Sequence, residues 1–302
     1  MSSGPSIYIQ HLTKQYAGTT SPSLSDLTVH VMPGEVYGFL GPNGAGKSTA
    51  IRTLMNFLQP TSGSAQILGY DIVRDSVAIK QHVGYLSGDF DVYPKMTGRQ
   101  YIAYLEELQG SQSQKYARDI EKRMQAVMNK KLGELSRGQR QKVGIIQAFM
   151  HKPEVLILDE PSSGLDPLMQ EVFYELVHEA KQRGAAIFIS SHIMAEVQKI
   201  CDRVGIIREG KLITERSVAD LAAEAAQTFD ITFSDKPPIA ALKKLQGVNL
   251  VSQKDNHVAL HLHGELQPLL QLLGNHRVTS IDSRNLDLEE MFMHYYHNGG
   301  NK

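Results

Sequence analysis

Short apolar runs alternate with helical patterns along the middle of the chain. The runs Val155–Leu158 and Ala185–Ser190 are each followed by a stretch with apolar residues at helical spacing, Pro167–Arg183 and His192–Cys201. Apolar strands that alternate with helices are typical of parallel sheets buried on both faces. The pattern therefore predicts an α/β fold with a mostly parallel core sheet covered by helices.

The first part of the chain has more strand patterns, separated by turns. Ser6–Gln10, Leu24–Val31 and Val36–Leu40 are rich in β-forming residues, whereas Thr49–Leu58 has helical spacing. Residues 97–131 are mostly helical by pattern, with charged faces. We therefore expect an N-terminal β part and a helical subdomain beside the core sheet.

The pattern changes near residue 218. An alanine-rich helix over Val218–Gln227 reads as a connector, and a small α+β pattern follows it. Its order β-α-β-β-α-β is that of a ferredoxin-like unit. The expected elements are Phe229–Ser234, Pro238–Leu245, Val248–Gln253, His257–His263, Leu266–Leu273, Val278–Ser283 and Leu288–Tyr296. We predict a main domain over 1–217, a connector over 218–228 and a small C-terminal domain over 229–302.

Composition narrows the class of protein. Of the 302 residues 41% are hydrophobic, which is enough for a full core, and the net charge of −1 lacks the basic excess of a nucleic-acid binder, so no nucleic acid is expected. The single cysteine, Cys201, excludes an internal disulfide and fits a reducing compartment. No apolar run approaches the roughly 18 residues of a membrane span. We expect a soluble intracellular protein whose membrane role, if any, depends on a partner.

The residues between the third predicted strand and the next helix form a phosphate-binding pattern. The stretch from Gly41 to Ser48 satisfies G-x-x-x-x-G-K-[ST]. Backbone N–H groups of such a loop cradle phosphates, Lys47 reaches the β- and γ-phosphates, and the Ser48 hydroxyl ligates Mg²⁺. The predicted ATP-binding residues of the loop are Gly41, Pro42, Asn43, Gly44, Ala45, Gly46, Lys47, Ser48 and Thr49.

Two acids end the strand Val155–Leu158. Asp159 is positioned to hold Mg²⁺, and Glu160 to face the γ-phosphate and polarise a water molecule. Without the glycine loop, the same two acids read as helix caps or as polar residues at the edge of a sheet.

Four further segments, in order along residues 6 to about 217, resemble the motifs of ABC ATPases. Leu135-Ser136-Arg137-Gly138-Gln139 resembles the L-S-G-G-Q signature, and Ser163–Asp166 looks like the D-loop. His192 is placed like the switch histidine, and Tyr16 like the aromatic residue that stacks on adenine. The resemblance implies a P-loop NTPase fold of the ABC type, with an antiparallel N-terminal β part and a helical subdomain.

The resemblance also implies a mechanism in which two ATPase domains meet head to tail. Ser136, Gly138 and Gln139 would contact the γ-phosphate of the nucleotide held by the second copy. Asp166 would run along the dimer seam, and His192 would hold the γ-phosphate and the attacking water. The structural alternatives are helix caps for Ser136 and His192, a turn for Asp166, and a core or surface aromatic for Tyr16.

Two positions depart from the family pattern. Arg137 replaces the first glycine of the signature. Gly88, in the stretch Tyr85–Phe90, stands where the family carries the glutamine of its Q-loop, and Asp89 follows it as a candidate replacement, off by one residue.

The amino-acid sequences of Tyr85–Phe90 and Leu286–Phe292 resemble the corresponding segments of the ATP-binding subunits of bacterial ABC-2-type exporters. This resemblance implies a second ATPase subunit, identical or related, and integral membrane permease subunits that hold the pair at the cytoplasmic face of the membrane. The rival class is a non-transport ABC ATPase that acts on nucleic acid or ribosomes. Such proteins carry two cassettes or a long coiled coil, whereas this chain has one motif set and no room for a coiled coil between Gly41 and Asp159. A metabolic kinase would leave the signature and His192 unexplained.

His257, His261 and His263 share one face of a predicted strand. A metal site and a solvated polar face both fit this spacing, and the solvated face explains it better.

Overall fold

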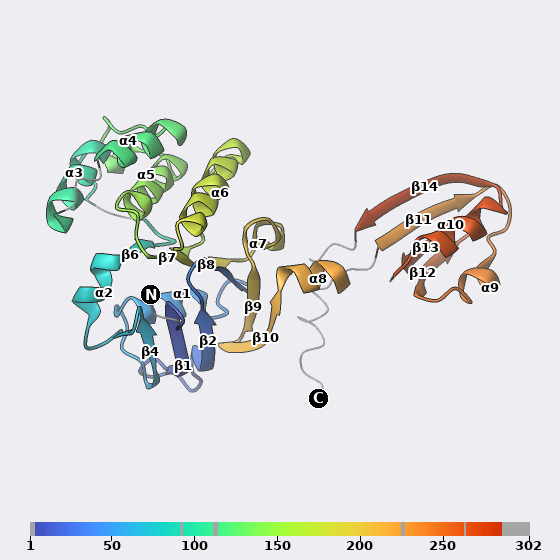
Figure 1. Cartoon of the computed structure of the whole chain (residues 1–302), viewed down its shortest axis with the longest axis horizontal. Coiled ribbons are helices and arrows are strands. Elements are labelled where there is room, and N and C mark those ends of the chain that lie inside the picture. The colour runs from blue at the N-terminus through green and yellow to red at the C-terminus, as the bar shows by residue number, and fades with distance from the viewer. Residues whose placement is uncertain (1–3, 91–92, 111–113, 225–226, 263, 286–302) are drawn as a thin grey trace. The chain divides into compact units, whose positions relative to one another are not determined.

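The structure of the chain is a computed structural model that describes residues 4–90, 93–110, 114–224, 227–262 and 264–285. The chain divides into two compact units, Met1–Arg216 and Ser217–Lys302. Each is described by itself below, with the element labels of Figure 1.

An antiparallel sheet forms the N-terminal part of the first unit. Its strands are β1 (Ile7–Lys14), β2 (Leu24–Val31), β4 (Ser62–Ile67) and β5 (Tyr70–Asp71), in the order β2-β1-β4-β5. Buried and exposed residues alternate along β2, as expected for a sheet with one face on the core. Leu27, Val29 and Val31 supply that buried face.

The second sheet is the core of the unit, with the order β10-β9-β3-β8-β7-β6. Its strands are β3 (Val36–Leu40), β6 (Val83–Leu86), β7 (Val155–Asp159), β8 (Ala186–Ser191), β9 (Arg203–Arg208) and β10 (Lys211–Ser217). The pairs from β9 to β6 are parallel. Since only Glu209 and Gly210 separate β10 from its neighbour β9, β10 runs antiparallel to it. The predicted mostly parallel core sheet is confirmed.

Helices and the N-terminal sheet cover the two faces of the core sheet. The helices are α1 (Lys47–Leu54), α2 (Ser76–His82), α3 (Gly98–Gln109), α4 (Gln114–Arg123), α5 (Arg137–Phe149), α6 (Pro167–Gln182) and α7 (Met194–Ile200). Tyr37, Phe39 and Phe188 point to one face and join the core formed with α1 and the N-terminal sheet. Helices α5, α6 and α7 lie on the opposite side (Figure 1). Gly84 allows α5 to approach β6, because a Cβ there would lie 2.0 Å from the Ala148 carbonyl oxygen.

Several boundaries differ from the sequence-based prediction. The helix expected over Thr49–Leu58 begins at Lys47 and ends at Leu54, because the glycine loop itself turns into the first helical residues. The region 97–131, predicted to be mostly helical, contains two helices: α3 begins after Thr97 with a capping box, and α4 ends at Arg123. Strands β4 and β6 were not expected, because β4 is mostly polar and β6 has only four residues.

The second unit contains the helix α8 (Val218–Glu224) and a four-stranded antiparallel sheet with the order β12-β13-β11-β14. Its other elements are β11 (Gln227–Phe233), α9 (Ile239–Leu242), β12 (Val248–Lys254), β13 (His257–Leu262), α10 (Gln267–Gly274) and β14 (Val278–Asn285). The ladder between β12 and β13 shifts register between Leu250 and Ser252, which leaves Val251 as the extra residue of a bulge. The helix expected over Leu288–Tyr296, and the stretch Leu286–Phe292, lie outside the described residues.

Two properties of the described residues bear on function. In that part of the chain no helix has both the length and the apolar character needed to cross a bilayer. The same residues contain no group of three or more His, Cys, Asp or Glu side chains able to hold a metal ion. Of the three histidines singled out above, His263 is not described, and His257 lies 3.7 Å from an Asp230 carboxylate oxygen.

Phe188 should be a main contributor to the stability of the first unit. Its ring is fully buried, 5.6 Å from the ring of Tyr37 and 5.3 Å from that of Phe39. Phe188→Ala should lower the free energy of unfolding by about 3–5 kcal/mol, measured by urea denaturation. Phe57→Ala, at a ring that is 53% exposed, should cost less than about 1 kcal/mol. Equal losses in the two variants would contradict this view of the core.

Candidate nucleotide-binding site

The loop between β3 and α1 is shaped by its glycines. Gly44 and Gly46 have φ angles of +80° and +110°, which favour glycine strongly. A Cβ at Gly46 would lie 2.5 Å from the Ser23 carbonyl oxygen, and one at Gly41 would lie 2.5 Å from that of Ile207. Because no side chain caps α1, its first N–H groups are available to an anion.

Lys47 is the first residue of α1, and its side chain is buried, with only 5% exposed. Its ammonium nitrogen Nζ donates to the carbonyl oxygens of Gly41, at 2.7 Å, and Pro42, at 3.1 Å. The same Nζ lies 3.4 Å from Glu160 Oε1. Ser48 and Thr49 follow in the first turn of α1, so the predicted loop residues lie together around one buried cation.

Glu160 follows β7 and lies at the point where the side chains of Lys47 and His192 meet. Its Oε1 is 3.4 Å from Lys47 Nζ and 3.3 Å from His192 Nδ1. Glu160 has a φ of +46°, a left-handed conformation that a non-glycine residue adopts only where its surroundings hold it. The two predicted catalytic residues, Glu160 and His192, are therefore brought together from the ends of adjacent parallel strands.

Asp159 is buried at the end of β7 and is held by the neighbouring strand. Its Oδ1 accepts a hydrogen bond from the Ser190 hydroxyl, which in turn accepts from the Glu160 N–H at 3.0 Å. A Cβ added at Gly88 would lie 3.4 Å from Asp159 Oδ2. The Q-loop position is therefore next to the carboxylate predicted to face a metal ion.

The residues present fit an Mg²⁺ ion. Mg²⁺ prefers oxygen ligands, often one or two carboxylates together with phosphate oxygens and water. Asp159 supplies a buried carboxylate, and Ser48 a hydroxyl one residue after Lys47. Asp89 instead lines a cavity of about 500 Å³ with Gly88, Phe90, Arg137, Arg140 and Gln141.

The signature turn, Ser136–Gln139, opens helix α5. Ser136 is the N-cap and accepts a hydrogen bond from the Gln139 N–H at 3.3 Å. The Gln139 side chain accepts from the Val127 N–H at 2.9 Å. Gly138 packs on another turn, since a Cβ there would lie 2.4 Å from the Gly164 carbonyl oxygen. The turn is thus fixed within the chain from both sides.

Asp166 and Tyr16 lie at the margins of the site. Asp166 is the N-cap of α6, accepting from the Met169 N–H at 3.1 Å. The Tyr16 hydroxyl is 3.4 Å from Thr49 Oγ1, which places the ring beside the first turn of α1. Ser136 therefore has the capping contact that its structural alternative predicted, whereas Asp166, for which the alternative was a turn, caps α6.

Sequence reasoning missed three polar residues that hold the site. Ser190 bridges Asp159 and Glu160, as described above. Gln141 donates to the Pro161 carbonyl oxygen at 2.8 Å. The buried carboxylate of Glu196 accepts from the Ser191 hydroxyl at 2.6 Å, one residue before His192. Only the Ser190-Ser191 pair had a sequence signal, because it directly precedes His192.

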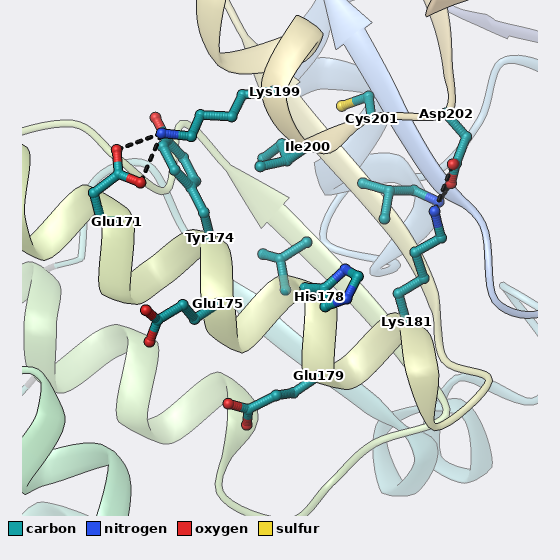
Figure 2. A pocket seen from close by; sticks show the side chains of 12 residues that line it. Glu171, Tyr174, Glu175, His178, Glu179, Lys181, Lys199, Ile200, Cys201 and Asp202 are labelled. Carbon is teal, nitrogen blue, oxygen red and sulfur yellow. Dashed lines mark hydrogen bonds and ion pairs between the residues drawn. The ribbon is translucent and has the colours of Figure 1, made fainter. Parts of the chain in front are cut away.

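A separate cavity of about 510 Å³ lies between α6 and α7. Figure 2 shows ion pairs from Lys199 to Glu171 and from Lys181 to Asp202 at its margins. None of the residues predicted to bind nucleotide lines this cavity, so we assign it no part in the site.

Comparison with known proteins gives consistent matches. A family model described as "ABC transporter" matches residues 24–163. The chain is 36% identical over 228 residues to the bacitracin transport ATP-binding protein BcrA of Bacillus licheniformis, over 74% of each chain. A solved ATP-binding subunit of an ABC transporter matches with a TM-score of 0.67 and 28% identity, over 71% of this chain and 91% of that one. The dimeric bacterial ABC transporter cassette MJ0796 shares the fold, with a TM-score of 0.65 and 21% identity, over 70% of this chain and 98% of that one.

Glu196 should make stability depend on pH. Burial raises the pKa of this carboxyl above its ordinary value of 4.5, against hydrogen bonds from Ser191 and Ser162. Below that value the carboxyl is protonated in both folded and unfolded chains. As the pH rises further, the unfolded chain loses this proton first, so the folded state is progressively disfavoured.

The Glu196→Gln variant has no ionisable carboxyl at this position. Its free energy of unfolding relative to that of wild type should therefore rise between about pH 4 and about pH 7.5, measured by urea denaturation at both pH values. Glu209→Gln, at a side chain that is 82% exposed, is the matched control and should show no such trend. A difference between Glu196→Gln and wild type that stays constant with pH would contradict the raised pKa.

Proposed function

The chain belongs to the ABC transporter ATP-binding proteins and is an ATPase, and from this premise we propose that it powers export through partner permease subunits. In this proposal it lies at the cytoplasmic face of the membrane, attached through those subunits. Residues 1–217 form the ATPase domain, joined through 218–228 to a C-terminal extension. The transport role of BcrA, a relative of similar length, supports the transporter class.

The convergence of Lys47 and His192 on one oxygen of Glu160 carries the proposal. A carboxylate held beside the Lys47 ammonium group and the His192 ring, next to a phosphate-binding loop, is suited to orient and polarise a water molecule that attacks the γ-phosphate. In this assignment Lys47 neutralises charge on the β- and γ-phosphates. His192, beside the same carboxylate, holds the γ-phosphate and the attacking water.

The remaining contacts with ATP follow from the same geometry. The N–H groups of the glycine loop surround the phosphates, and Tyr16, beside Thr49, stacks on the adenine. Ser48 and Asp159 would hold Mg²⁺. The ion supplies positive charge to the phosphate oxygens on which negative charge develops.

A second ATPase subunit, identical or related, completes each site in the proposed mechanism. Ser136 is exposed at the N-terminus of α5, where Gly138 and Gln139 follow it. A helix N-terminus attracts phosphate, so this turn is suited to the nucleotide held by the second copy. Asp166 is likewise exposed and would line the seam between the copies. The dimeric cassette MJ0796, which shares the fold, supports this arrangement.

We assign permease docking to an exposed cluster of aromatic rings that follows the Q-loop position. Tyr93 and Tyr104 are 54% and 37% exposed, and the Tyr93 ring lies 5.9 Å from that of Tyr104 and 6.1 Å from that of Tyr101. Exposed tyrosines are frequent anchors of protein interfaces. The cluster begins two residues after Gly88 with Phe90, whose ring lies 5.9 Å from that of Tyr101, so it directly follows the Q-loop position that lies beside Asp159.

Glu160→Gln should retain ATP binding and lose hydrolysis. Loss of a general base costs on the order of 10²–10⁴ in rate, whereas the loop and Lys47, which bind the phosphates, are unchanged. Phosphate release and equilibrium binding of a fluorescent ATP analogue measure the two properties. The control is Glu154→Gln, which changes an exposed carboxylate that contacts the His82 ring. This variant should behave as wild type. Normal turnover by Glu160→Gln would show that another residue activates the water.

The double variant Tyr93→Ala, Tyr104→Ala should separate permease binding from hydrolysis. Loss of two aromatic anchors should weaken the complex by at least about 30-fold, a cost of about 2 kcal/mol. The measurement is the amount of polytopic membrane protein retained from detergent-solubilised membranes, with the basal ATPase rate alongside. Tyr70→Ala, at a similarly exposed ring on β5, should retain the permease. If the double variant retains as much permease as Tyr70→Ala does, the aromatic cluster is not the docking surface.

A further inference from the structure

The first two turns of α5 are attached to the segment that carries Glu160. This segment, residues 160–166, connects β7 to α6 and is named the 160–166 segment. Gln141 lies two residues after the signature turn, is only 3% exposed, and donates from Nε2 to the Pro161 carbonyl oxygen at 2.8 Å and to that of Glu160 at 3.4 Å. A buried amide thus binds the backbone on both sides of the Glu160–Pro161 peptide bond.

Arg137 makes a second attachment from the signature turn itself. The guanidinium nitrogen Nη2 of Arg137 donates to the Ser163 hydroxyl at 3.0 Å, and the Arg137 side chain lies against Gly164. A cation in the first turn of a helix opposes the helix dipole, so α5 gains nothing locally from this arginine. The Ser163 N–H in turn donates to the Glu160 carbonyl oxygen at 3.1 Å. Arg137 is therefore connected to Glu160 through one residue.

Close packing allows little independent movement of the two elements. Gly138 of the signature turn approaches Gly164 so closely that a Cβ would lie 2.4 Å from its carbonyl oxygen. Lys142, a buried cation on the next turn of α5, lies 4.0 Å from the carboxylate of Asp166. A displacement of the signature turn must therefore move the 160–166 segment with it.

We infer that Gln141 and Arg137 are positioning residues that transmit occupation of the signature turn to Glu160, a residue with a left-handed backbone conformation. The inference rests on the proposed function, in which the signature turn contacts the nucleotide held by the second copy. Glu160 acts on the nucleotide of its own chain. The attachment therefore couples the two ATP sites of a dimer through the interior of each subunit.

Gln141→Met tests the buried attachment, because it keeps the length of the side chain and removes the donor. The experiment measures the ATPase rate of the full chain against MgATP concentration. We expect kcat to fall about 10- to 100-fold, because a small misplacement of a reacting group has a cost of that order. The KM should be little changed, and the Hill coefficient should fall from a wild-type value between 1 and about 2 to about 1. Gln147→Met is the matched control: Gln147, on the same helix, donates to the Tyr85 carbonyl oxygen, outside the 160–166 segment, and the variant should keep the wild-type Hill coefficient.

Ser163→Ala tests the second attachment at a partly exposed position where folding is not at risk. It and Arg137→Gly should lower the Hill coefficient equally, and the double variant should show no further loss, because both remove one interaction. If Arg137→Gly lowers the rate while Ser163→Ala behaves as wild type, Arg137 acts on the nucleotide directly and the inference fails for it.

The outcomes also separate the inference from the proposed function. If the wild-type chain does not hydrolyse MgATP, the proposed function is wrong. If it hydrolyses MgATP with a Hill coefficient of 1, only the inferred coupling between the two sites is wrong. If Gln141→Met folds, by its thermal unfolding transition, and loses rate without a change in Hill coefficient, Gln141 supports Glu160 only locally and the coupling is overturned.

Discussion

The Ser190 hydroxyl joins the carboxyl ends of two neighbouring strands, and the geometry of the site depends on this link. It donates to the Asp159 carboxylate on β7 and accepts from the N–H of Glu160, while the Ser190 carbonyl oxygen also accepts from that N–H. Because β7 and β8 are parallel and in register at this point, His192 emerges beside Glu160. The cationic end of Lys47 arrives from the third strand of the group, β3, through the glycine loop.

Local sequence was enough to predict the parts of the site that depend on local geometry. The glycine loop could be found because its φ angles and close contacts demand glycine at fixed spacing. Val155–Asp159 could be found because a strand buried on both faces has no polar residue until its end. His192 was placed through a family resemblance, and its contact with Glu160 follows from strand order, which a single sequence does not reveal.

Residues that act through tertiary contacts could not be predicted. Gln141 lies on a helical face where a glutamine is unremarkable by pattern, and its partners are carbonyl oxygens of a segment distant in sequence. Glu196 reads as an ordinary helix surface residue until α7 packs on the core sheet and buries it. Strand β4 has only Ala65 and Ile67 buried, and its polar neighbours gave too weak an alternation to predict a strand.

The bulge at Val251 affects how the chain behaves when it is concentrated. Strand β12 is an edge of the second sheet, and an edge strand with an unbroken hydrogen-bonding row can add strands from other molecules. The extra residue interrupts that row, and the side chains of Asn249, Ser252 and Lys254 are exposed around it. The bulge thereby makes this edge of the second unit a poor template for the addition of strands from other molecules.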